Sequence, residues 1–259
     1  RAGRLLPRQH SHAGRVPESV KRDAILVTGA GQRLGLHLAE AFLERGHDVI
    51  ATYRTDRPAV QRLRDAGVDM LACDFLEAGQ IDDLVEHVRA RYVSLRALIH
   101  NASAWLPDDA GPKTEAVMNR MMRVHVTAPY RLNLELAPLL EACSEPHADI
   151  IHVGDYVSSR GSRKHVAYAA SKAAQDNLTL SFAAKLAPKV KVNSIAPALV
   201  LFNEGDDARY RARAVRKNLM GREGGAGEFL HAVDYLLDSA FVTGRVLPMD
   251  GGRHLQQQH

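Results

Sequence analysis

A tyrosine and a lysine stand four residues apart in the segment Tyr168-Ala169-Ala170-Ser171-Lys172. On a helix, this spacing places both side chains on one face. A phenol has an ordinary pKa of about 10, and a neighbouring ammonium group favours its ionised form, which suits the phenol to acid–base work near neutral pH. The pair therefore predicts proton transfer, although the same spacing also arises on helix surfaces that carry no chemistry.

A glycine-rich turn lies upstream, in the segment Thr28–Gly35, between an expected strand and an expected helix. In a dinucleotide-binding fold, a turn in this position directs backbone N–H groups at a pyrophosphate. We expect Gly29 to make the tight turn, Gly31 to let the backbone approach the ligand, and Gly35 to let the helix pack closely on the strand. A purely structural turn is the alternative.

The residues that follow the second expected strand bear on the choice of dinucleotide. An acidic residue at this point selects NAD, whereas a basic residue accommodates the 2′-phosphate of NADP. Here the strand ends in Tyr53-Arg54-Thr55, without a carboxylate. Arg54 offers a bidentate donor and Thr55 a hydroxyl, so the sequence favours NADPH over NADH. The alternative is that Arg54 is a solvated surface charge.

The hydrophobic pattern predicts a single doubly wound α/β domain over residues 23–259, with a parallel sheet covered by helices on both faces. The expected strands are Ala24–Thr28, Asp48–Tyr53, Val68–Ala72, Ala97–His100, Asp149–Gly154, Val190–Ile195 and Gly244–Leu247. The expected helices are Arg33–Arg45, Pro58–Ala66, 80–91, 113–142 with a bend near Pro129, and Val166–Leu186. Residues 198–224 are too long for a simple connection, and we expect a mobile lid there.

Composition argues against several classes of function. The chain has no apolar run long enough to cross a bilayer and no secretory signal, so we expect a cytoplasmic protein without a membrane partner. Its two cysteines, Cys73 and Cys143, lack the spacing of a metal site, and we expect buried thiols and no metal.

The basic character of the chain is concentrated in its first residues. Residues 1–22 hold six basic side chains against Glu18 alone, whereas the whole chain has a formal net charge of +4. The remainder is therefore slightly acidic. We expect residues 1–22 to be a disordered tail, and we predict no nucleic-acid partner.

With these motifs in place, the sequence resembles the short-chain dehydrogenase/reductase family from about Ala24 to Leu255. The matching segments, in order, are Thr28–Gly35, Asp74, Asn101-Ala102-Ser103, Tyr168 with Lys172, Val192–Pro197 and Val242–Gly252. The resemblance implies a Rossmann-type fold and a homo-tetramer built on the long helices. It also implies NADPH contacts at Gly29, Gly31, Arg33, Leu34, Gly35, Arg54, Thr55, Asp74, Phe75, Asn101, Ala102, Ser103, Tyr168, Lys172 and Pro197.

Three departures from the family pattern point to one branch. Arg33 replaces the middle glycine of the turn, Asp155 stands where a serine usually precedes Tyr168, and Trp105 ends the Asn101 segment. These features resemble the pteridine reductases, and the segments around them are most similar to the bacterial dihydromonapterin reductases. The resemblance implies NADPH-dependent reduction of a dihydropterin, either 7,8-dihydromonapterin or dihydrofolate. The implied catalytic residues are Tyr168, Lys172 and Asp155, and the implied substrate contacts are Arg33, Trp105, Asp155, Tyr168 and Leu199.

Each departure has a chemical rationale in a pterin site. Trp105 would stack on the flat heterocycle, Arg33 would donate to the pterin carbonyl or the cofactor phosphates, and Asp155 would supply a proton to a ring nitrogen. The alternatives are that Trp105 is a core aromatic residue and Asp155 a cap. His125 occupies the position of a family asparagine that anchors a water chain. We expect a packed structural histidine there and leave it outside the catalytic set.

Three other functions remain open at this point. The first is an ordinary carbonyl reductase of the same fold, in which Asp155 would be anomalous. The second is a non-catalytic NADPH-sensing protein in which Tyr168 and Lys172 are relics. The third is nucleic-acid binding through the tail.

Overall fold

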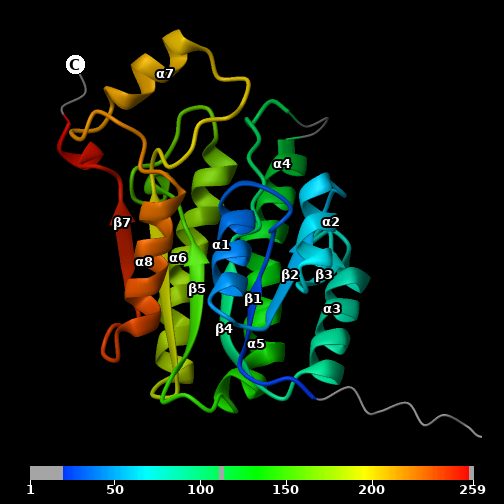
Figure 1. Cartoon of the computed structure of the whole chain (residues 1–259). Coiled ribbons are helices and arrows are strands. Elements are labelled where there is room, and N and C mark those ends of the chain that lie inside the picture. Colours follow the sequence, from blue (N-terminus) through cyan, green and yellow to red (C-terminus); the bar gives the residue numbers. More distant parts are fainter. Residues whose placement is uncertain (1–19, 111–113, 257–259) are drawn as a thin grey trace, which may run out of the picture.

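The computed structural model describes residues 20–110 and 114–256, and its centre is a parallel β-sheet (Figure 1). In the described residues the sheet has seven strands in the order β3-β2-β1-β4-β5-β6-β7, and every neighbouring pair is parallel. The order reverses at β1, which confirms the predicted doubly wound architecture. The strands are β1 (Ala24–Val27), β2 (Val49–Tyr53), β3 (Asp69–Ala72), β4 (Leu95–His100), β5 (Ala148–Val153), β6 (Val190–Pro197) and β7 (Val246–Met249).

Helices cover both faces of this sheet, because its central strands are apolar on both sides. In β1, Ala24 and Leu26 enter one core, and Ile25 and Val27 enter the other. The first core also contains buried residues of α3 (Ala78–Arg91), α5 (Ala128–Glu141) and α6 (Val166–Leu186). The second contains residues of α1 (Arg33–Glu44), α2 (Pro58–Asp65) and α8 (Ala226–Asp238). Both cysteines are buried free thiols, as expected.

The long helix predicted over 113–142 is divided in the structure. α4 (Thr114–Met122) leads into a π-helical turn, η1 (Arg123–Thr127), and α5 follows. The predicted bend near Pro129 is therefore a wide turn just before that residue. Such turns are rare and often lie at functional sites.

Two helices were not predicted. α7 (Ala208–Val215) lies inside the segment expected to be a lid, and α8 lies just beyond it. Short 3₁₀ turns complete the described structure, at η2 (Tyr156–Ser159) and η3 (Arg253–Leu255). Among the described helices, none combines the length and the apolar character needed to span a membrane.

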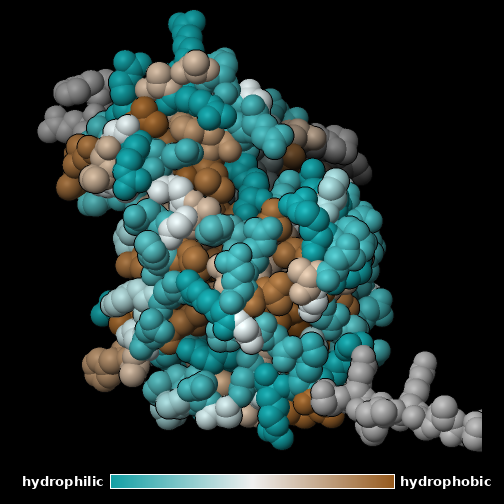
Figure 2. All heavy atoms as spheres, viewed as in Figure 1, coloured by the Kyte–Doolittle hydropathy of each residue, from teal (hydrophilic) through white to brown (hydrophobic). Residues whose placement is uncertain are grey.

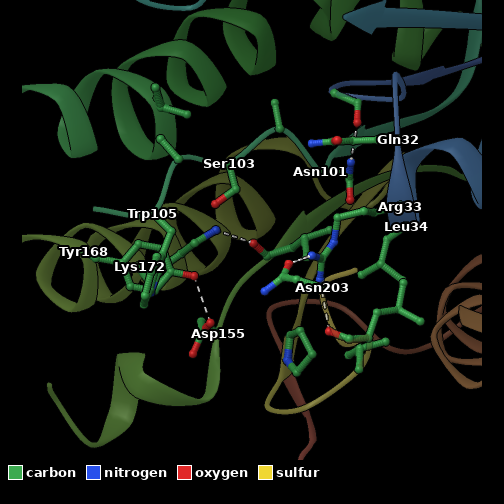
Figure 3. Close-up of a pocket in the computed structure, with 18 of the residues that line it drawn as sticks. Gln32, Arg33, Leu34, Asn101, Ser103, Trp105, Asp155, Tyr168, Lys172 and Asn203 are labelled. Atoms are coloured by element: carbon green, nitrogen blue, oxygen red, sulfur yellow. Dashed lines mark hydrogen bonds between the residues drawn. The ribbon is translucent and has the colours of Figure 1, made fainter. Parts of the chain in front are cut away.

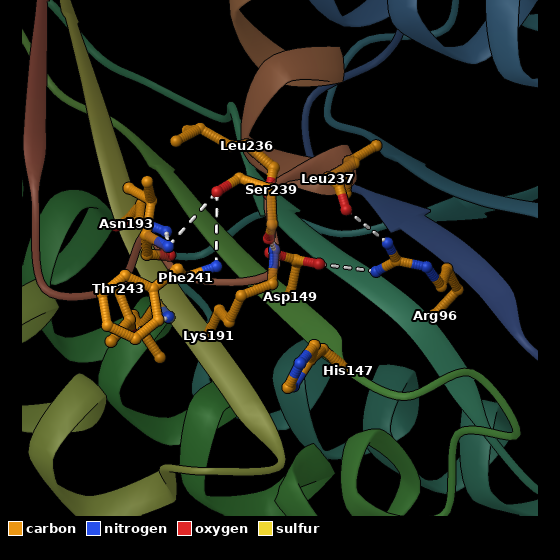
Figure 4. Close-up of polar contacts among 12 residues, drawn as sticks. Arg96, His147, Asp149, Lys191, Asn193, Leu236, Leu237, Ser239, Phe241 and Thr243 are labelled. Atoms are coloured by element: carbon orange, nitrogen blue, oxygen red, sulfur yellow. Dashed lines mark hydrogen bonds and ion pairs between the residues drawn. The ribbon is translucent and has the colours of Figure 1, made fainter.

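A buried ionic cluster fixes the C-terminal end of α8 against the sheet (Figure 4). The carboxylate of Asp149 on β5 lies 2.9 Å from the Lys191 ammonium and 2.6 Å from the Arg96 guanidinium. Lys191 also donates to the Leu236 carbonyl oxygen at 2.6 Å, and Arg96 donates to that of Leu237 at 2.8 Å. Cations at the C-terminus of a helix oppose its dipole and satisfy its last carbonyl groups. One buried carboxylate thereby orients two cations toward α8.

Lys21, which falls in the predicted tail of residues 1–22, pairs with the folded domain. Lys21 forms an isolated bridge with Tyr92 and an ion pair with Asp48 at 2.7 Å. Lys21 therefore belongs to the folded domain rather than to the predicted tail. The rest of the predicted disordered tail, residues 1–19, lies outside the described residues.

Candidate active site

A cleft of about 860 Å³ opens at the carboxyl ends of the parallel strands, the usual ligand position in doubly wound folds (Figure 3). The predicted cofactor and substrate residues line it, with the exception of Gly35. A Cβ atom at Gly35 would lie 2.4 Å from both the Gly29 carbonyl oxygen and the Asn101 amide nitrogen. Gly35 is therefore required for close packing of the helix on the turn, as predicted, and it does not line the cleft.

The glycine-rich turn and the segment that begins at Asn101 hold each other in place. The Asn101 amide donates to the carbonyl oxygens of Thr28 and Gly29 at 3.0 Å each. The Ala102 N–H donates to the Thr28 hydroxyl, also at 3.0 Å. Gly29 has a φ of 70°, and a Cβ there would lie 2.7 Å from the Ala102 Cα. Glycine is thus required on both conformational and steric grounds.

Arg33 has the left-handed backbone conformation of the glycine that it replaces, with a φ of 55°. For a residue with a Cβ this conformation costs about 1–2 kcal/mol. The guanidinium donates to the side-chain oxygen of Asn203 and, at 3.1 Å, to the carbonyl oxygen of Leu201. Arg33 therefore connects the glycine-rich turn to the segment 198–224, across one end of the cleft (Figure 3).

Asp155 uses its two carboxylate oxygens for different purposes. One oxygen accepts the N–H of Val157 at 2.9 Å and caps η2. The other accepts the Tyr168 hydroxyl at 2.8 Å (Figure 3). The cap considered from the sequence is present, and so is the contact with Tyr168. Burial, and then the charge of Asp155, raise the pKa of Tyr168 above its ordinary value.

Lys172 lies on the same helix face as Tyr168, as predicted, but its ammonium points elsewhere. It donates to the Val153 carbonyl oxygen at 2.7 Å and to Gln175 Oε1 at 3.3 Å, and it lies 5.8 Å from the centre of the Tyr168 ring. Complete burial lowers the pKa of Lys172 to about 8. The expectation that Lys172 lowers the pKa of Tyr168 is wrong here, because burial and the Asp155 carboxylate favour the neutral phenol.

His125 reaches the site from the π-helical turn η1. Its Nε2 accepts the Ala104 N–H at 3.1 Å and lies 2.9 Å from the Ser103 hydroxyl. Its Nδ1 is therefore the protonated nitrogen and donates to the Ser171 hydroxyl at 2.8 Å, which in turn donates to the Tyr168 carbonyl oxygen at 2.7 Å. Burial lowers the pKa of His125 to about 2, so the ring is neutral. It is a packed histidine that positions the neighbouring segments.

Trp105 is not a core residue, since 63% of it is exposed. Its ring stacks on that of His165, with 4.1 Å between the ring centres and 24° between the planes. The carboxylate of Asp108 accepts the N–H groups of Val166 at 2.8 Å and Ala167 at 3.1 Å, at the start of α6. The segment that carries Trp105 is thereby fixed to the helix that carries the tyrosine–lysine pair.

Comparison with known proteins agrees with this geometry. A family model described as enoyl-(acyl carrier protein) reductase matches residues 29–254. The chain belongs to the short-chain dehydrogenase/reductase family. It is 52% identical to a dihydromonapterin reductase of Klebsiella pneumoniae subsp. pneumoniae over 232 residues, which is 90% of this chain and 97% of the relative. It is 51% identical, with the same coverage, to a dihydromonapterin reductase of Escherichia coli O6:K15:H31.

Solved structures of this family include similar proteins. FolM alternative dihydrofolate reductase 1 from Brucella canis, complexed with NADP, is 27% identical with a TM-score of 0.80, over 93% of this chain and 97% of that one. An aldohexose dehydrogenase from Thermoplasma acidophilum has the same TM-score at 23% identity, over 92% and 96% of the two chains, which is a likeness of fold alone.

The residues that line the cleft fit NADP, the dinucleotide bound in the FolM structure. Gly29 and Gly31 have no side chains that would cover the backbone of the turn, and Arg54 and Thr55 line the cleft. Within the described residues, Arg54 has no carboxylate partner, so its guanidinium is available to a phosphate. The Asp74 carboxylate accepts the Leu76 N–H at 3.0 Å, which leaves its second oxygen for a ligand.

Sequence reasoning missed several residues that line the cleft of this short-chain reductase, and three of them, His165, Lys217 and Arg253, have side chains that could take part in binding. His165 stands three residues before Tyr168, and its position at the start of the catalytic helix was the available signal. Lys217 comes from the end of the lid segment and Arg253 from η3. Only the fold brings these two cations to the same opening.

Proposed function

We propose that this chain reduces a 7,8-dihydropterin to the tetrahydro form, with NADPH as the hydride donor. The observation that carries the proposal is the 2.8 Å hydrogen bond between Tyr168 and Asp155, at a position where the family usually has serine. The named activity of relatives at 52% and 51% identity supports it, as does the NADP in the FolM structure.

Binding is assigned to two parts of the cleft. The glycine-rich turn would hold the pyrophosphate of NADPH, and Arg54 with Thr55 would hold its 2′-phosphate. The exposed ring of Trp105 would lie against one face of the pterin. Arg33 would supply donors at the edge between the two ligands. Bound NADPH supplies a hydride to a carbon of the pterin ring, and the protein must then deliver one proton to the adjacent nitrogen.

That proton is assigned to Asp155 rather than to Tyr168. Burial and the Asp155 charge raise the pKa of the phenol, which makes it a weak acid. Asp155 is only half-buried and lines the cleft, so it can take a proton from water and pass it to the ring nitrogen. Tyr168 keeps its own proton and orients the carboxyl group through their hydrogen bond. Lys172 would bind the ribose of the cofactor at the buried end of the cleft.

Steady-state kinetics with purified protein test the proposal. NADPH consumption is followed with 7,8-dihydromonapterin, with dihydrofolate and with fully oxidised pterins, and each reaction is repeated with NADH. We expect turnover of the dihydropterins and a preference for NADPH. An absence of NADPH oxidation at stoichiometric enzyme concentration would refute it.

A homo-tetramer is part of the same proposal. Tyr130 and Leu134 on α5 and Leu180 on α6 are large apolar side chains that are exposed in the isolated chain. Large exposed apolar groups on neighbouring helices are typical of an interface between subunits. Light scattering coupled to size exclusion should give the mass of four chains. A Tyr130→Glu variant should lower that mass, and an unchanged mass would argue against this interface.

A further inference from the structure

Two cationic side chains line the outer part of the cleft, and a third lies close enough to one of them to affect its pKa. Lys217 and Arg253 line the same cleft as Asp155 and Tyr168, and Arg213 lies one helical turn before Lys217. Within the described part of the chain, none of the three cations forms an ion pair with a carboxylate. We call Arg213, Lys217 and Arg253 the rim cluster. Its charge is available to a ligand.

The spacing on α7 directs one side of this helix toward the cleft. Tyr210, Ala214 and Lys217 are four and then three residues apart, and all three line the cleft. Such spacing defines one helix face, which continues into the residues just after Val215. Hydrophilic side chains predominate on the part of the surface that α7 forms (Figure 2).

Backbone contacts fix the third cation beside this face. The N–H groups of Leu219 and Met220 donate to the Gly251 carbonyl oxygen at 2.8 and 3.2 Å, so the end of the lid lies against the turn that precedes Arg253 (Figure 1). The Arg253 guanidinium lies 4.8 Å from the centre of the Tyr156 ring. Tyr156 directly follows Asp155 in the chain. Arg253 therefore packs against the segment that carries the proposed proton donor, and both residues line the same cleft.

The nearby carboxylates of the lid each accept one backbone N–H group. Asp206 accepts the Asn203 N–H at 2.8 Å, Asp207 accepts the Tyr210 N–H at 2.6 Å, and Glu223 accepts the Phe202 N–H at 3.1 Å. Within the described residues, none of these acids forms an ion pair with a cation of the rim cluster, so the cations repel one another without a directly paired carboxylate. Burial, and then the charges of Arg253 and Arg213, lower the pKa of Lys217. An anion bound here would relieve the repulsion.

On the basis of the proposed function, we propose that the rim cluster binds an anionic group on the side chain of the pterin substrate. The pterin ring would lie between Trp105 and Asp155, and its substituent would extend toward Lys217 and Arg253. The anion is either a glutamate carboxylate of a folate or a phosphate ester on a short pterin side chain. Substrates with such a group would be preferred to uncharged pterins.

The test compares charged and uncharged substrates in four proteins. Wild type, Lys217→Gln, Arg253→Gln and the control Arg209→Gln are assayed for kcat/KM with 7,8-dihydromonapterin, its phosphate ester, dihydrofolate and dihydrofolate triglutamate. Arg209 is on the same helix and its replacement removes the same charge, but it does not line the cleft. Each assay is run at low and at high ionic strength.

We expect each rim variant to reduce the preference for charged over uncharged substrate by about three- to tenfold, because these are partly exposed charge-assisted contacts. High salt should reduce the preference in wild type, and Arg209→Gln should leave it unchanged. A larger effect on the phosphate ester would identify phosphate as the anion, and a larger effect on the triglutamate would identify a folate. An unchanged preference in both rim variants, or an equal loss in the control, would overturn the inference.

Different results would show that the rim cluster binds no anion and that the chain reduces no pterin. Wild-type turnover of dihydromonapterin with no preference for charged substrates would overturn only the rim cluster. If wild type reduces no pterin, the proposed function fails, and titration of the protein with folic acid in the presence of NADP⁺ decides the anion site separately. Weaker binding of folic acid by Lys217→Gln than by Arg209→Gln would then support it, and equal binding would overturn it.

Discussion

Replacement of Asp155 by asparagine removes the proposed proton donor and leaves the rest of the site nearly unchanged. The amide has nearly the same shape, and its oxygen can still accept the Val157 N–H that caps η2. It cannot supply a proton, and its NH₂ group would face the Tyr168 hydroxyl in place of an acceptor. A general acid contributes about 10²- to 10⁴-fold, or about 3–5 kcal/mol of transition-state stabilisation. We expect kcat for 7,8-dihydromonapterin to fall by that factor.

Two further measurements distinguish the loss of a proton donor from a loss of folding. NADPH affinity, measured by titration, should change by less than about twofold. Loss of the cap on η2, or loss of folding, would weaken NADPH binding by more than that. Asp155→Ser keeps a good cap and restores the residue usual in the family, so this variant should lose pterin reduction and gain reduction of a simple ketone. If either variant retains dihydropterin turnover within about threefold of wild type, Asp155 is not the proton donor. Pterin and ketone rates from the same preparations supply both comparisons.

Three other outcomes follow from the structure. Burial lowers the pKa of His100 to about 4 and that of His125 to about 2, and it lowers the pKa of His152 well below its ordinary value. The unfolded chain therefore binds more protons below about pH 6.5, and the free energy of unfolding should fall by about 4 kcal/mol from about pH 7.5 to about pH 5.5. Urea titrations at both values check this, and a fall of less than about 1 kcal/mol would contradict it. Lys172→Met removes a buried ammonium group, so the free energy of unfolding should rise by about 1–2 kcal/mol while turnover is lost. Thermal melts measure the stability and steady-state rates measure the turnover. A variant less stable than wild type would argue against this reasoning. Arg54→Gln should raise KM for NADPH by about tenfold or more with little change for NADH, whereas a parallel rise for both would show that Arg54 does not contact the 2′-phosphate.

The parallel sheet could be predicted closely because its strands are buried on both faces and read as continuous apolar runs. β1, β2 and β5 agree with the expected ranges within about one residue, in keeping with the ordinary uncertainty of element ends. β4 begins two residues earlier than expected, at Leu95, because Arg96 is paired with the buried Asp149. A charged side chain in the sequence concealed a position inside the sheet.

α8 was missed because its beginning lacks a capping signal. Its buried residues Phe229, Val233 and Leu236 have helical spacing. Gly225, however, precedes the helix with a φ of 88° and has no side chain to cap it. α7 gave an even weaker signal, since Ala214 is its only buried residue. Both helices depend on tertiary contacts more than on local sequence.

The site residues could be predicted as a set, whereas their electrostatics could not. Motif spacing identified Tyr168 and Lys172, the family resemblance added Asp155, and the fold brings the three into one cleft. The direction of the Tyr168 pKa depends on burial and on which side chain its hydroxyl reaches, and neither is visible in a spacing. The contact of Arg33 with Asn203 joins residues 170 positions apart in the chain. Such contacts become apparent only in three dimensions.

The π-helical turn η1 has a consequence for insertions and deletions. A π turn is equivalent to one residue inserted into an α-helix, and each residue of an α-helix advances it by about 100°. Deletion of one residue between 123 and 127 would therefore close the wide turn into a regular α-helical turn and leave α4 nearly unrotated relative to α5. Val117 and Met121, which pack in one cluster with Tyr168, would then keep that packing, whereas the same deletion inside α4 or α5 would turn the two helices relative to each other. Family members of different length in this helix should accordingly be compared by superposition rather than by counting along the chain.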